Sequence, residues 1–107
     1  MKIYTSYSEG RLTLYFQGEL DHHESKKAVV EAEEAILSYL PRDCVIDMSS
    51  LSFMDSSGIA VILRIYKRMS TNGGRTRIEN AAGQPLRVLD TSGIDRIIKV
   101  FSVKEHV

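Results

Sequence analysis

The stretch between residues 44 and 71 constrains the fold more than any other part of the chain. The apolar run from Cys44 to Met48 has the length of a covered strand. The polar segment from Ser49 to Asp55 is predicted to be a loop, and Ser57 to about Thr71 carries apolar residues at helical spacing. A strand, a loop and an amphipathic helix in this order predict a sheet with helices packed on it, which is an α/β class of fold.

Strand and helix patterns continue on both sides of this segment. The stretches Lys2 to Tyr7 and Arg11 to Gln17 flank a turn at Glu9 and Gly10, and they predict a β-hairpin. The other expected elements are a helix from about His22 to Leu40, a strand from Arg75 to Glu79, a short helix from Pro85 to Leu89, and a strand or short helix within residues 97–103. The expected order is therefore β-β-α-β-α-β-α-β.

Each long helix has a predicted buried stripe. In the first helix the stripe consists of Val29, Ala32, Ile36 and Leu40, and in the second it consists of Ile59, Ile62, Leu63, Tyr66 and Met69. Val61, Arg64 and Arg68 point roughly the other way. We therefore expect these outward positions to be free for contacts with a partner, for which arginine is well suited.

Composition and charge favour a small cytoplasmic protein. The 107 residues suffice for one domain with a single core. Because the formal net charge is +0, a nucleic acid is not an expected partner. The first residues lack the apolar core of a signal peptide, and no apolar run is long enough to span a bilayer, so no membrane contact is expected. Cys44, the only cysteine, is expected to be a buried thiol.

Two adjacent hydroxyls, Ser56 and Ser57, precede the second helix and have two interpretations. Serine and aspartate are common N-caps, so capping is the simpler account of both serines from their spacing alone. The alternative is a regulatory switch, because a phosphate added at a helix start has large electrostatic effects. Asp21 is likewise expected to cap the first helix, with Glu24 at the spacing of a capping box.

Catalytic and metal-binding interpretations have weaker support. A serine hydrolase would have to combine Ser56 with His22 or His23 and with Asp21, but the sequence contains no Gly-x-Ser-x-Gly or Ser-x-x-Lys motif. The two adjacent histidines diverge on a helix or strand, and no spacing typical of zinc ligands occurs. We therefore expect no enzymatic activity, no metal and no cofactor.

Several stretches together resemble the STAS domain family, and within it the anti-sigma-factor antagonists. They are Gly18 to His23, Leu51 to Gly58, Val61 to Leu63 with Tyr66 and Lys67, and Asp90 to Ile94. The resemblance covers almost the whole chain at matching spacings. It implies a single STAS domain over residues 1–107, a four- to five-stranded mixed sheet with helices mainly on one face, and a protein without catalytic activity.

The resemblance also implies a mode of action. The unphosphorylated protein would bind, as a monomer, an anti-sigma factor that is also a serine kinase, and would thereby release a sigma factor. The kinase would phosphorylate Ser56, which matches the family's acceptor position, and a separate serine phosphatase would remove the phosphate. A scaffold or ligand-sensing STAS domain in another bacterial signalling complex is the alternative function.

The expected docking surface combines the turn after the second strand, the segment around Ser56 and the outward side of the second helix. Its members are Gly18, Glu19, Leu20, Asp21, His22, His23, Met54, Asp55, Ser56, Ser57, Gly58, Val61 and Arg64. Within this set, Gly58 is expected to keep side-chain bulk away from the serine backbone, as a kinase cleft requires, and the alternative is that it merely eases the bend into the helix.

Overall fold

The chain forms a five-stranded mixed sheet with helices packed on it. In the computed structural model, which describes residues 1–103, the elements are β1 (Lys2–Ser8), β2 (Arg11–Leu20), α1 (His22–Tyr39), β3 (Asp43–Met54), α2 (Ser56–Thr71), β4 (Arg75–Ala81), α3 (Gly83–Ser92), the 3-10 helix η1 (Ile94–Arg96) and β5 (Lys99–Ser102). The strand order is β1-β2-β3-β4-β5, with β1 antiparallel to β2 and each later pair parallel. The predicted α/β class and mixed sheet are confirmed.

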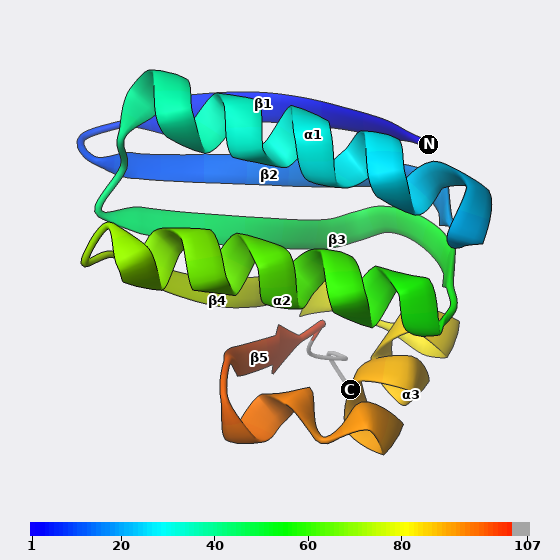
Figure 1. Ribbon diagram of the computed structural model, residues 1–107. Coiled ribbons are helices and arrows are strands. Elements are labelled where there is room, and N and C mark those ends of the chain that lie inside the picture. The colour runs from blue at the N-terminus through cyan, green and yellow to red at the C-terminus, as the bar shows by residue number, and fades with distance from the viewer. Residues whose placement is uncertain (104–107) are drawn as a thin grey trace.

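The strand order explains why the helices share a face. Each step from β2 to β3, β4 and β5 moves in the same direction across the sheet, and crossovers between parallel strands are almost always right-handed. Figure 1 shows α1 along β1 and β2, α2 along β3 and β4, and α3 near the start of α2. Among the residues described, no helix combines the length and the apolar composition that a membrane crossing needs.

The hydrophobic core lies between the sheet and the helix layer. In β2 buried and exposed side chains alternate, which is the pattern of a strand with one covered face, whereas residues 44–48 of β3 are all buried. The fully buried side chains come from β2, β3 and β4 and from α1 and α2, and they include Leu12, Leu14, Phe16, Ala32, Ile36, Ile46, Ile62, Ile65, Met69 and Ile78.

The prediction of a loop from Ser49 to Asp55 was wrong, because β3 continues to Met54. β2 is also longer than predicted, and its residues 17–20 pair with β3 residues between 50 and 54 through two register shifts. The backbone of this part of β3 therefore finds its hydrogen-bond partners in β2. Exposed serines give the segment the composition of a loop, while Leu51 and Met54 supply its buried side chains.

The helix faces differ from the prediction in two respects. In α1 the buried stripe contains Ala28 rather than Leu40, which is 66 % exposed and ends the helix in a left-handed conformation. In α2 the expected orientation of two residues is reversed, because Val61 is 1 % exposed and Leu63 is 38 % exposed. α2 packs against α1 as well as against the sheet, so its buried arc is displaced toward α1.

Candidate functional site

The start of α1 and the start of α2 lie side by side at one end of the sheet (Figure 1). β2 and β3 run parallel and end together, with Leu20 opposite Met54. Asp21 and Asp55 come next in each case, have extended backbones, and cap the two helices. The register of the strands thus brings together the two segments that were expected to share one docking surface.

Asp55 links the two helix starts. Its Oδ1 accepts a hydrogen bond from the backbone N–H of Ser57 at 2.8 Å, and its Oδ2 accepts one from the backbone N–H of His22 at 3.2 Å. One carboxylate therefore satisfies an otherwise unpaired donor of each helix. The expectation that Ser57 caps α2 was wrong, since Ser57 is the second residue of the helix and Asp55 is the cap.

Asp21 caps α1 as predicted, and its Oδ1 accepts a hydrogen bond from the backbone N–H of Glu24 at 3.0 Å. The predicted capping box is incomplete, because the carboxylate of Glu24 bonds elsewhere. Its Oε1 accepts a hydrogen bond from the N-terminal amine of Met1 at 3.1 Å. This ion pair holds the start of the chain against the start of α1.

The two adjacent serines differ in exposure and in surroundings. Ser56 is exposed as the first residue of α2, whereas Ser57 is half-buried, with its Oγ 3.5 Å from Nδ1 of His22. Ser57 lines a groove between α1 and α2, which we call the α1–α2 groove. Ser56 lines a second groove, between α2 and α3, which we call the α2–α3 groove. The structure therefore separates two hydroxyls that their sequence context does not.

The α1–α2 groove combines apolar and charged side chains and has a volume of about 670 Å³. Its apolar lining comes from Val29, Val30, Ala60 and Val61, and its polar lining includes His22, Lys26, Glu33 and Arg64. A concave surface with an apolar centre and a few placed polar groups is typical of a binding site.

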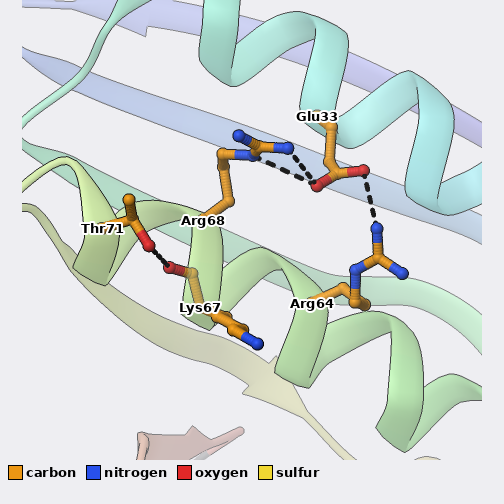
Figure 2. Close-up of polar contacts among 5 residues, drawn as sticks. All are labelled: Glu33, Arg64, Lys67, Arg68 and Thr71. Atoms are coloured by element: carbon orange, nitrogen blue, oxygen red, sulfur yellow. Dashed lines mark hydrogen bonds and ion pairs between the residues drawn. The ribbon is translucent and has the colours of Figure 1, made fainter.

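Glu33 ties α1 to α2 beside this groove (Figure 2). Its Oε1 accepts a hydrogen bond from Arg64 at 3.3 Å, and its Oε2 accepts two from Arg68 at 3.2 and 3.1 Å. The Arg64 side chain is 60 % exposed, as expected, but it is already paired within the protein. Such exposed pairs add little stability, yet two guanidinium groups against one carboxylate leave this surface positive.

α3 is attached to the end of β3 through Gln84, a residue that sequence reasoning missed. The backbone N–H of Met54 donates to Oε1 of Gln84 at 2.9 Å, and Nε2 of Gln84 donates to the carbonyl oxygen of Met54 at 2.8 Å. This double hydrogen bond places α3 next to Ser56. No local pattern identifies Gln84, because the contact joins residues 30 positions apart.

Four members of the predicted docking surface are buried. Leu20 and Met54 have no exposed surface, Val61 has almost none, and Gly58 is also buried, so the expectation that these four residues contact a partner is contradicted by their burial. A Cβ added to Gly58 would collide with the Met54 side chain and would lie 3.2 Å from Cδ2 of Leu20. Gly58 thus allows α2 to pack closely on the strands. The exposed or half-buried members are Gly18, Glu19, Asp21, His22, His23, Asp55, Ser56, Ser57 and Arg64.

The candidate hydrolase residues are not arranged as a catalytic relay in the part of the chain that the structure describes. The carboxylates of Asp21 and Asp55 accept hydrogen bonds from backbone N–H groups, and the imidazole of His22 lies near Ser57. Within residues 1–103, no three His, Cys, Asp or Glu side chains are placed to hold a metal ion. Burial raises the pKa of the Cys44 thiol to about 12, which disfavours a reactive thiolate.

Comparison with known proteins agrees with this architecture. Residues 3–106 match the STAS domain. The anti-sigma F factor antagonist of Paenibacillus polymyxa is 34 % identical over 101 residues, which cover 94 % of this chain and 86 % of that protein. The anti-sigma-B factor antagonist of Bacillus subtilis (strain 168) is 26 % identical over 98 residues, which cover 92 % of this chain and 88 % of that protein.

Solved structures show the same fold. The anti-sigma factor antagonist SpoIIAA in its unphosphorylated form matches with a TM-score of 0.79 and 24 % identity, covering 97 % of this chain and 90 % of that chain. An anti-sigma factor antagonist from Mycobacterium paratuberculosis matches with a TM-score of 0.82 and 19 % identity, covering 95 % of this chain and 86 % of that chain. The strand order, the helix layer and these matches together show that the chain belongs to the STAS domain family.

Proposed function

We propose that this chain is an anti-sigma-factor antagonist controlled by phosphorylation of Ser56. In its unphosphorylated form it binds an anti-sigma factor serine kinase and releases the sigma factor, and a serine phosphatase reverses the inactivation. It acts in the cytoplasm as a monomeric single domain, by binding rather than by catalysis. The names of the two relatives support the antagonist role, and the Asp-Ser-Ser-Gly sequence at residues 55–58 supports the position of the switch.

The observation that carries this proposal is the position of Ser56 on the molecule. Ser56 is exposed at the first position of α2, where it lines the α2–α3 groove, and the next residue, Ser57, lines the α1–α2 groove. A phosphate there adds about −1.5 to −2 charges. The start of a helix tolerates negative charge, so the fold of the free protein need not change.

A partner that covers this region would respond differently, because it would have to desolvate the phosphate. A loss of about 3 kcal/mol of binding free energy weakens the affinity by roughly two orders of magnitude. Repulsion and desolvation at the interface are therefore sufficient for a switch, and no rearrangement of the antagonist is required.

The α1–α2 groove is the central part of the proposed docking surface. Val30 is 52 % exposed within it, and Val29 and Ala60 extend the apolar area toward the start of both helices. His22 and Arg64 line the same groove and supply polar contacts, and Ser56 lies one residue from the groove-lining Ser57. A kinase seated in this groove would therefore reach the acceptor serine and be displaced by its phosphate.

Incubation with the cognate anti-sigma kinase and ATP, followed by intact mass and peptide mapping, tests the proposal. We expect one phosphate on Ser56, loss of the kinase in a pull-down, and recovery of binding after phosphatase treatment. Ser56→Ala should bind the kinase without being phosphorylated, and the matched variant Ser57→Ala should still be phosphorylated. A phosphate found on Ser57 alone would contradict the acceptor assignment. A large assembly by size-exclusion chromatography, without kinase binding, would favour a scaffold instead.

A further inference from the structure

The α2–α3 groove holds a positive charge beside Ser56. The groove has a volume of about 450 Å³ and is lined by Ser56 and Ile59 of α2 and by Gln84, Arg87 and Val88 of α3, among others. Within residues 1–103, Arg87 is the one charged side chain that lines it. Arg87 is exposed and forms no ion pair with the described part of the chain. Its guanidinium group is therefore available to an anion in the groove.

Gln84 determines which side of α3 faces this groove. Its two hydrogen bonds to Met54 hold it against the end of β3, two residues before Ser56. Residues three apart lie on the same face of a helix, so Arg87 lies on the same side of α3 as Gln84. The attachment of α3 to the strand thus keeps Arg87 near the acceptor serine.

We propose that Arg87 is the internal counter-ion of a phosphate on Ser56, so that the phosphorylated protein holds the phosphate in the α2–α3 groove. This inference rests on the proposed function, because that function supplies the phosphate. A guanidinium group suits the role, since its planar N–H groups bind two phosphate oxygens at once.

The neighbouring serine has different surroundings. Ser57 lines the α1–α2 groove, whose basic side chains are His22, His23, Lys26 and Arg64, and Arg87 is not part of that lining. A phosphate on Ser57 would therefore not be paired with Arg87. Arg87 acts as a positioning residue for the phosphate on Ser56, and it holds the added charge on the α3 side of Ser56, within the surface that a kinase reaching the acceptor serine has to cover.

A protein with phosphoserine incorporated at position 56 during translation tests the pairing without any kinase. Phosphorus NMR follows the second proton dissociation of the phosphate in the parent protein and in Arg87→Gln, Arg87→Lys and Arg11→Gln. Arg11 is a matched control, because it is exposed at the opposite end of β2 and its substitution removes the same charge. Asp55 and His22, which also lie near the start of α2, are present in every variant, so their effects cancel.

We expect the midpoint of the phosphate titration to lie roughly half a pH unit lower in the parent than in Arg87→Gln, because a counter-ion favours the dianion. Arg87→Lys keeps the charge and should keep at least half of this difference, and Arg11→Gln should titrate like the parent. Equal midpoints for the parent and Arg87→Gln would overturn the pairing. An equally large change in Arg11→Gln would also overturn it, because the effect would then reflect net charge alone.

The two proposals fail in different ways. If the anti-sigma kinase left Ser56 unmodified, the proposed function would be contradicted, whereas the titration could still show the pairing in the phosphoserine protein. If the kinase modified Ser56 and Arg87→Gln titrated like the parent, only the role of Arg87 would be wrong. Thermal melts of the unphosphorylated variants should coincide with that of the parent, because Arg87 and Arg11 are both exposed.

Discussion

Replacing Gly58 with alanine tests whether this glycine serves packing or access to Ser56. Gly58 is the third residue of α2 and does not have a positive φ, so alanine fits its backbone conformation. Glycine in a helix costs about 0.5–1 kcal/mol relative to alanine. Helix propensity alone therefore predicts that Gly58→Ala increases the free energy of unfolding.

The packing around Gly58 predicts the opposite sign. The new Cβ would collide with the side chain of Met54 and would lie 3.2 Å from Cδ2 of Leu20, and both side chains are fully buried. Extra methyl groups in a packed core typically cost about 1–3 kcal/mol, which exceeds the gain in propensity. We expect a net loss of about 1 kcal/mol, which lowers the Tm by roughly 4–8 °C for a domain of this size.

Urea denaturation and thermal melts of the unphosphorylated protein measure this change. Ala60→Gly, at an exposed position of the same helix, measures the propensity contribution alone and should cost about 1 kcal/mol. Met54→Ala combined with Gly58→Ala should be less destabilising than the sum of the single changes, because it removes the collision. A Gly58→Ala protein that is as stable as the parent, or more stable, would refute the packing argument and favour the access interpretation.

The features predicted correctly are those that a short stretch of sequence determines. The hairpin, the order of helices and strands, and the Asp21 cap each depend on periodicity or on residues within one turn of each other. The buried state of Cys44 follows from the apolar run that contains it. In these places local preference and tertiary packing agree.

The features that were missed depend on contacts between distant parts of the chain. β3 continues past Met48 because β2 offers it a pairing edge, although its own serines resemble a loop. Val61 is buried because α1 lies beside α2, which the pattern of α2 alone does not reveal. The second hydrogen bond of Asp55 and both bonds of Gln84 likewise join residues about thirty positions apart.

Three further predictions concern the caps, the thiol and the switch. Asp55→Ala should lower the free energy of unfolding by about 2 kcal/mol and Asp21→Ala by about 1 kcal/mol, because Asp55 also accepts a hydrogen bond from the backbone N–H of His22. Equal losses for the two variants in urea denaturation would show that this additional hydrogen bond contributes nothing. Burial raises the pKa of the Cys44 thiol to about 12, so iodoacetamide at pH 8 should label only unfolded protein. The free energy of unfolding should fall as the pH rises from 9 toward 12, because the thiol ionises first in the unfolded chain. Rapid labelling of the folded protein would contradict this. Ser56→Asp should weaken kinase binding by about tenfold in titration calorimetry, which is less than the effect of phosphorylation. A carboxylate brings one negative charge, whereas a phosphate brings up to two negative charges and three acceptor oxygens. Parent affinity in Ser56→Asp, together with loss of binding on phosphorylation, would show that a single negative charge at this position does not displace the kinase.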